Sequence, residues 1–97
     1  MYTTITKFKI PSILEDILKD LQKIGATPIL VGGCVRDYFL NIPVKDYDVE
    51  IFGIDCIQTI EKSLQKFGSV KLVGKSFGVL TLKVDKYECL VRLIDEN

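Results

Sequence analysis

Two aspartates separated by one residue, Asp46 and Asp48, are the side chains of this sequence best suited to chemistry. They begin the segment 46–52, in which polar and apolar residues alternate, and residues i and i+2 of a β-strand project from the same face. Mg²⁺ takes one or two protein carboxylates together with substrate phosphate oxygens, and two such cations could activate a hydroxyl nucleophile and stabilise a leaving pyrophosphate. The pair therefore predicts a Mg²⁺ and nucleoside triphosphate site, although an isolated Asp-x-Asp also fits a solvated polar stripe on a half-covered strand.

A glycine pair, Gly32-Gly33, lies upstream of the aspartates, between an apolar run and a segment with helical periodicity. Glycine allows backbone N–H groups to approach a phosphate at the positive end of a helix. Arg36 follows closely and offers a guanidinium suited to polyphosphate. Gly-Gly alone is also a common turn, but in combination with Arg36 and the acidic strand it predicts a phosphate-binding turn.

A second glycine-containing segment, 74–78, does not match a P-loop. A P-loop carries a glycine five residues before its final glycine, and Ser69 occupies that place here, with Gly68 one place too early. A strand rather than a helix is expected after the segment. We therefore expect a turn at the end of the sheet, in which Lys75 could contact a nucleotide.

Hydrophobic periodicity predicts eight elements in the order α, β, α, β, α, β, β, β. The expected helices and strands cover residues 12–24, 27–31, a short helix after 33, 46–52, 55–67, 70–73, 79–84 and 87–93. The first helix begins with the capping-box pattern Ser12-Ile13-Leu14-Glu15, and Asp85-Lys86 separates the last two strands as in a tight hairpin. This order predicts an α/β or α+β domain in which helices flank a mixed sheet.

Composition restricts the class of protein. Ninety-seven residues, 47% hydrophobic and 27% charged, suit one small globular domain. Thirteen basic and thirteen acidic residues give a net charge of zero, so no global positive field attracts nucleic acid and any RNA should bind locally. The start lacks a signal-peptide pattern and no apolar run reaches the ~18 residues of a membrane helix, so we expect a cytoplasmic protein without a membrane partner.

The cysteine and histidine content excludes several kinds of site. Cys34, Cys56 and Cys89 contain no CxxC pair, and no histidine is present to complete a zinc site. The missing histidine also excludes Ser-His and Cys-His catalysis. We expect the three cysteines to behave as small buried hydrophobic residues.

The combined motif resembles the signature of class II tRNA CCA-adding enzymes and bacterial poly(A) polymerases. It consists of Val31-Gly32-Gly33-Cys34-Val35-Arg36-Asp37, then Leu40, then Asp46-Tyr47-Asp48, and the turn at 74–78 is also similar, so that the resemblance covers about 29–84. The resemblance implies a polymerase-β-like nucleotidyltransferase head with Asp46 and Asp48 as catalytic, metal-binding carboxylates and Mg²⁺ as the cofactor.

The same resemblance implies a nucleotide-binding role for Gly32, Gly33, Arg36 and Asp37. The first three match the phosphate site, and Asp37 matches the family acid beside the arginine, where it would orient the guanidinium. Glu50 shares the strand face of the aspartates, but the family motif does not make it a ligand, and we expect a solvated neighbour.

The sequence departs from that family in two places. Many relatives carry an aspartate at the position of Leu90, so an acidic contribution from the last strand is expected to be lost, and Glu88 either substitutes for it or is an exposed edge-strand residue. The chain ends at Asn97. We therefore expect it to lack the neck, body and tail of full-length relatives, which select the base and hold RNA.

The leading hypothesis is an RNA nucleotidyltransferase head domain, weak or inactive alone, that transfers a nucleoside monophosphate from ATP or CTP to a tRNA or other RNA 3′-hydroxyl by two-metal chemistry. A noncatalytic nucleotide-binding module is the first alternative. An interaction protein or a truncated gene remnant, in which the fold survives without ligand binding, is the second. Base specificity and oligomeric state stay open at this level.

Overall fold

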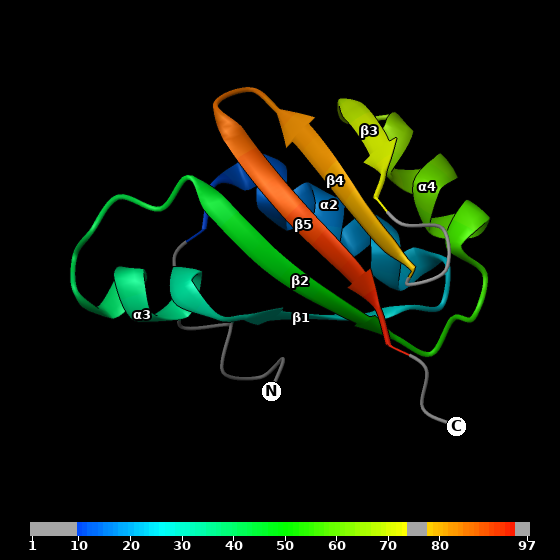
Figure 1. Ribbon diagram of the computed structural model, residues 1–97, viewed down its shortest axis with the longest axis horizontal. Coiled ribbons are helices and arrows are strands. Elements are labelled where there is room, and N and C mark those ends of the chain that lie inside the picture. Colours follow the sequence, from blue (N-terminus) through cyan, green and yellow to red (C-terminus); the bar gives the residue numbers. More distant parts are fainter. Residues whose placement is uncertain (1–9, 74–77, 95–97) are drawn as a thin grey trace.

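The computed structural model describes residues 10–73 and 78–94. Its elements are α2 (Ser12–Lys23), β1 (Thr27–Val31), α3 (Gly33–Phe39), β2 (Asp46–Phe52), α4 (Ile57–Gln65), β3 (Ser69–Leu72), β4 (Val79–Val84) and β5 (Tyr87–Leu93). The strands form one mixed sheet in the order β1-β2-β5-β4-β3 (Figure 1). The predicted element order and the mixed α/β class are confirmed.

The strand order places the last strand of the sequence in the middle of the sheet. β2 runs antiparallel to β1 and parallel to β5, whereas β4 runs antiparallel to both β5 and β3. A parallel pair needs a long connection, here supplied by α4, β3 and β4. The expectation that Glu88 lies on an edge strand is therefore wrong, because hydrogen-bonded neighbours flank β5 on both sides.

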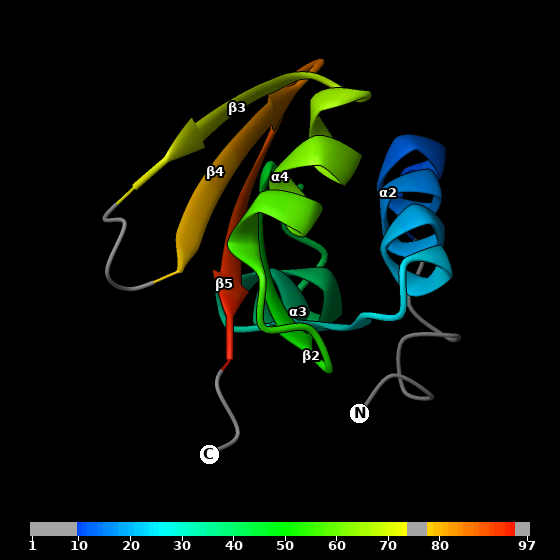
Figure 2. The same ribbon diagram turned by 90° about the vertical axis from the view of Figure 1, so that its right-hand side faces the viewer.

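The helices α2 and α4 cover the same face of this sheet, as Figure 2 shows from the side. Alternate strand residues point toward these helices, and in β2 they are Tyr47, Val49 and Ile51, with exposed fractions of 3%, 2% and 0%. The opposite face has no covering helix among the described residues (Figure 2). Among the described residues, the sheet therefore has one face buried by helices and one face without them.

Helix α2 buries Leu14, Ile17, Leu18 and Leu21, the spacing of one helical face. It ends in a Schellman arrangement, in which Gly25 adopts φ 95° and the N–H of Ala26 donates to the carbonyl of Leu21 at 3.0 Å. Glycine suits this position because the left-handed region strains other residues.

The predicted capping box at the start of α2 is wrong. Pro11 is the N-cap residue, Ser12 is already helical, and no side-chain capping hydrogen bond forms. Glu15 instead pairs with Lys19 one turn later, with Oε1 and Nζ 3.3 Å apart. The backbone N–H of Glu15 donates to the carbonyl of Pro11 at 3.1 Å, so that helical hydrogen bonding takes over the role expected of the serine hydroxyl.

A polar contact joins α2 to α4 behind the sheet. The hydroxyl of Ser63, a buried side chain, donates to Oδ2 of Asp20, and Nζ of Lys66 lies 2.7 Å from the same oxygen. The hydrogen bond from Lys66, followed by that from Ser63, lowers the pKa of Asp20. The two helices are thus held together by a carboxylate with two donors as well as by apolar contacts.

Two of the three cysteines are buried as expected. Cys34 and Cys89 belong to the core, and burial raises the pKa of Cys89 to about 12. Cys56 departs from the expectation, since it is exposed in the segment before α4. None of the helices in the described part of the chain is both long enough and apolar enough to cross a membrane.

Candidate functional site

Strand β2 places Asp46 and Asp48 together on the helix-free face of the sheet. The intervening Tyr47 points into the core, so the period-two alternation separates apolar from acidic side chains as predicted. Glu50 continues the acidic row but is not merely solvated, because its Oε2 lies 3.5 Å from Nη1 of Arg92 on β5. This ion pair leaves Asp46 and Asp48 as the unpaired carboxylates of β2 among the described residues.

The neighbouring strand β5 determines what lies beside the two aspartates. In the parallel register, Glu88 is the partner of Asp46 and Leu90 is the partner of Asp48, at a strand spacing of about 4.8 Å. Glu88 is exposed on the same face. The acidic residue of β5 therefore lies next to the first aspartate of the pair, and an apolar side chain lies next to the second.

The carboxylates do not form a closed metal site by themselves. Among residues 10–73 and 78–94, no three His, Cys, Asp or Glu side chains are gathered closely enough to hold a metal ion. Carboxylate oxygens are nevertheless the ligands that Mg²⁺ prefers, and this cation commonly completes its shell with water and phosphate oxygens. The donor set fits Mg²⁺ that arrives together with a triphosphate.

The glycine turn contacts the second aspartate directly. Gly32 is the N-cap residue of α3 and adopts φ 78° and ψ −149°, a conformation favourable only for glycine. A Cβ atom added to Gly32 would lie 2.7 Å from Oδ2 of Asp48. Glycine is thus required both by the backbone conformation and by the close approach of the carboxylate, and the predicted turn between strand and short helix is confirmed.

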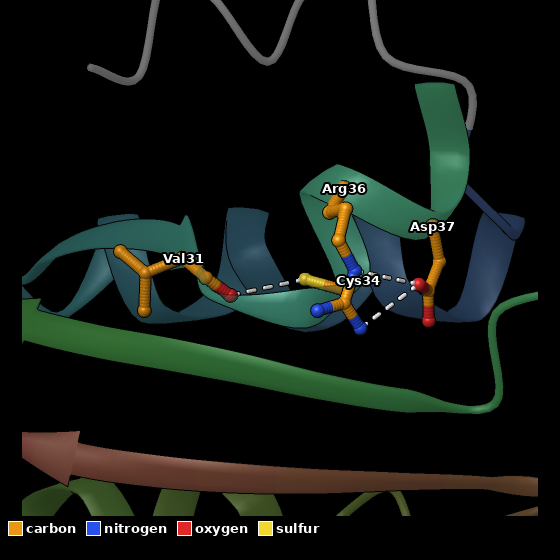
Figure 3. Close-up of polar contacts among 4 residues, drawn as sticks. All are labelled: Val31, Cys34, Arg36 and Asp37. Atoms are coloured by element: carbon orange, nitrogen blue, oxygen red, sulfur yellow. Dashed lines mark hydrogen bonds and ion pairs between the residues drawn. The ribbon is translucent and has the colours of Figure 1, made fainter. Parts of the chain in front are cut away.

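Arg36 folds back toward the start of its own helix. Its Nε and Nη2 atoms both lie 3.2 Å from Oδ1 of Asp37 (Figure 3). A Cβ atom on Gly33 would lie 3.3 Å from Nη2 of Arg36, so the guanidinium is close to the glycine turn. The Arg36 side chain is 71% exposed, and Asp37 restrains it while leaving nitrogens available to a ligand.

Cys34 stabilises the glycine turn by a hydrogen bond to the end of β1. Its thiol donates to the carbonyl of Val31, the last residue of β1, at 3.2 Å (Figure 3). Burial raises the pKa of this thiol, and the charge of nearby Asp48 also raises it, whereas a hydrogen bond with the Asp48 backbone lowers it. The side chain therefore stays a neutral thiol that packs between α3 and β2, and we assign it a structural role.

Sequence reasoning missed the contacts that depend on strand register. The ion pair between Arg92 and Glu50 and the position of Glu88 beside Asp46 follow from the pairing of β5 with β2, which no local pattern reveals. The expected contact from Lys75 lies outside the described residues.

Known proteins with similar sequences belong to the family that the sequence motif resembles. The family model for the poly(A) polymerase head domain matches residues 29–93. The chain is 44% identical over 50 residues to the multifunctional CCA protein of Neisseria gonorrhoeae. The aligned segment covers 52% of this chain and 11% of that protein. A multifunctional CCA protein of Haemophilus ducreyi is 42% identical over 40 residues, or 41% of this chain and 10% of that protein.

Solved structures share the fold. A CCA-adding enzyme in complex with ATP superposes with a TM-score of 0.74 at 18% identity, covering 95% of this chain and 23% of that one. A tRNA nucleotidyltransferase complexed with a primer tRNA and an incoming ATP analog gives a TM-score of 0.68 at 25% identity. The match covers 81% of this chain and 23% of that one. The chain thus spans about a tenth of the curated relatives and under a quarter of these solved chains. Because the family match extends from β1 to the end of β5, the chain belongs to the poly(A) polymerase head domain family, whose relatives include the CCA-adding nucleotidyltransferases.

Proposed function

We propose that this head domain binds a nucleoside triphosphate with Mg²⁺ and transfers its nucleoside monophosphate to the 3′-hydroxyl of an RNA. The observation that carries the proposal is the close approach of the Asp48 carboxylate to Gly32, because it puts a group suited to cations beside a glycine turn suited to phosphate. Family membership supports the same chemistry.

Asp46 and Asp48 would hold Mg²⁺ on the helix-free face, with phosphate oxygens completing the coordination. The bound cation would supply Lewis-acid stabilisation of the charge that develops on the transferred phosphate. Glu88 would add negative charge beside Asp46 and so increase the local attraction for cations.

The triphosphate would lie along the turn and the start of α3. The backbone N–H groups of Gly32 and Gly33 would approach the phosphates without hindrance from Cβ atoms, and Arg36 would offer its remaining guanidinium nitrogens to phosphate oxygens. Asp37 would keep the guanidinium oriented and so reduce the entropy lost on binding.

In the proposed reaction, the RNA 3′-oxygen forms a bond to the α-phosphorus while the bond from that phosphorus to the bridging oxygen of the β-phosphate breaks. Pyrophosphate leaves, and the hydroxyl proton passes to water. ATP and CTP are the proposed substrates and a tRNA 3′ end the proposed acceptor, because related solved chains are complexes with ATP, CTP or primer tRNA.

Isothermal titration of the chain with Mg²⁺-ATP and Mg²⁺-CTP tests the site. We expect saturable binding by the unaltered chain and at least a tenfold loss in Asp46→Asn/Asp48→Asn, because this variant keeps the shape of both side chains and removes both charges. Asp16→Asn/Asp55→Asn, which removes two exposed carboxylates elsewhere, is the matched control. Equal affinity for the site variant and the control would contradict the assignment.

A noncatalytic nucleotide-binding module is the second candidate. Leu90 favours it, because this side chain places an apolar group beside Asp48 where many relatives of the resembled family carry an acid. Incorporation of radiolabelled nucleotide into tRNA that lacks its 3′ end separates the two candidates, since the module would bind Mg²⁺-ATP without extending the RNA.

A further inference from the structure

The helix-free face continues from β2 across β5 to β4 and β3 (Figures 1 and 2). Two rows of paired residues cross it, Asp46-Glu88-Lys83-Ser69 and Asp48-Leu90-Thr81-Lys71. From the strand spacing, Lys83 lies about 10 Å from Asp46, and Lys71 lies about 14 Å from Asp48. The two lysines therefore lie on the same surface as the proposed metal ligands, at the far side of β5.

The far part of this surface is cationic. Strands β3 and β4 contain no Asp or Glu, and both Lys71 and Lys83 are exposed. Neither lysine forms an ion pair with another residue in the ranges 10–73 and 78–94, in contrast to Arg92, which is engaged with Glu50. Two ammonium groups without an ion pair on a helix-free sheet surface are electrostatically complementary to a polyanion.

The geometry of the proposed reaction indicates which polyanion would bind on β3 and β4. Gly32 approaches Asp48 from the side of β1, so in the proposed function the triphosphate and its leaving pyrophosphate would occupy that side of the carboxylate pair. Phosphoryl transfer requires the attacking and leaving oxygens to be roughly in line with the phosphorus. The attacking hydroxyl must then approach from the opposite side, over β5 and β4.

We propose that Lys83 and Lys71 bind the sugar-phosphate backbone of the RNA strand whose 3′-hydroxyl is extended, and that this strand crosses the sheet from β3 toward Asp46. The inference rests on the proposed function and states where the acceptor RNA would lie on the sheet. The net charge of zero makes such a local cationic track the principal electrostatic attraction for RNA on this face.

The salt dependence of RNA binding tests the proposal. A fluorescein-labelled single-stranded RNA with a free 3′-hydroxyl is titrated with the full chain at several salt concentrations, with fluorescence anisotropy as the readout. The slope of log K for association against log salt is negative, and in Lys71→Ala/Lys83→Ala its magnitude should decrease by about 1.4, that is, about 0.7 for each lost phosphate contact with a single strand. The control Lys23→Ala/Lys62→Ala removes two exposed lysines from the helix-covered side and should leave the slope unchanged.

The outcomes separate this inference from the proposed function. Titration with Mg²⁺-ATP is performed on the same proteins, and the lysine variants should bind it as the unaltered chain does. Intact Mg²⁺-ATP binding combined with equal slopes for both lysine pairs, or with no RNA binding by the unaltered chain, would overturn the RNA path alone. Failure of the unaltered chain to bind Mg²⁺-ATP would instead overturn the proposed function.

A cross-linking experiment tests the direction independently. RNA that carries 4-thiouridine next to its 3′ end is irradiated with the chain in the presence of Mg²⁺-ATP, and the linked peptides are identified. We expect links to peptides from β4 and β5. Links confined to Lys45 and Lys86, which line a separate groove of about 700 Å³ beside the start of α2, would place the RNA elsewhere and contradict the proposal.

Discussion

At the scale of single residues, both the backbone conformation and the surroundings of Gly32 disfavour a side chain. Its φ of 78° with ψ of −149° is a region that other residues reach only with strain, and an added Cβ would collide with Oδ2 of Asp48. Gly33 differs, because an added Cβ there would meet only the end of the flexible Arg36 side chain. A Cβ atom is thus disfavoured at Gly32 by strain and by a close contact, whereas at Gly33 it meets only a flexible side chain.

This difference predicts unequal effects of the same substitution. Gly32→Ala should lower the free energy of unfolding by about 1 to 3 kcal/mol, the usual cost of such backbone strain, and should weaken Mg²⁺-ATP binding by displacing the Asp48 carboxylate. Gly33→Ala should be close to neutral for stability, and the larger Gly33→Val should weaken triphosphate binding by obstructing the backbone N–H groups. Urea unfolding and calorimetric titration measure both effects. Equal destabilisation by the two alanine variants would show that the strain at Gly32 is not significant.

At the scale of elements, the connection between α2 and α4 depends on one carboxylate. Asp20 accepts hydrogen bonds from Ser63 and Lys66, and these contacts lower its pKa. The folded state therefore favours the ionised carboxylate more than the unfolded chain does. The resulting stabilisation is present above the unfolded pKa of Asp20 and is lost as the pH falls through the lower folded pKa.

Asp20→Asn should accordingly reduce both stability and its acid dependence. We expect a loss of about 1 kcal/mol at neutral pH, a modest value because Lys66 is 60% exposed and water screens its charge. The difference between the variant and the unaltered chain should decrease as the pH falls below about 4. Denaturant unfolding at several pH values measures it, with Asp16→Asn, an exposed position on the same helix, as the control. A difference that stays constant with pH would exclude a role for the Asp20 charge.

At the scale of the whole molecule, the proposed cation and phosphate ligands lie in one small sheet and its first turn. These matched relatives are roughly three and a half to five times as long as the chain, so most of their sequence lies outside the matched region. In the proposed function, binding of Mg²⁺-NTP needs only the residues at β2 and α3. Extension of RNA also requires the acceptor hydroxyl to be held in line, and orientation of this kind can supply ~7 to 11 kcal/mol.

We therefore expect the chain alone to bind Mg²⁺-ATP and Mg²⁺-CTP with similar affinity and to extend RNA slowly. Calorimetry measures the two affinities, and incorporation of radiolabelled ATP and CTP into tRNA without its 3′ end measures extension, with Asp46→Asn/Asp48→Asn as the blank. Rapid extension with strong selection for one base by purified chain would contradict this expectation. Such a result would mean that the head contains a base-selecting surface of its own.

Much of the candidate site could be predicted from the sequence because it depends on local periodicity. Alternation in β2 is sufficient to place Asp46 and Asp48 on one face, and a glycine pair between an apolar run and a helical segment is sufficient to predict the turn. Local patterns also predicted the order of the elements. The capping box at Ser12 failed at this same local level, because the helix began one residue earlier than the pattern implied.

Only the tertiary structure decided what lies next to these residues. Strand order and register depend on which strands pack together across the whole sheet, and shifting a register by one residue would change every neighbour without altering any local pattern. The parallel pairing of β5 with β2 places Glu88 beside Asp46 and lets Arg92 neutralise Glu50. The packing of α3 against β2 likewise brings Gly32 to Asp48. The sequence alone thus determined the chemical groups and their faces, whereas nonlocal packing decided their partners, because contacts between distant segments form only when the sheet is assembled.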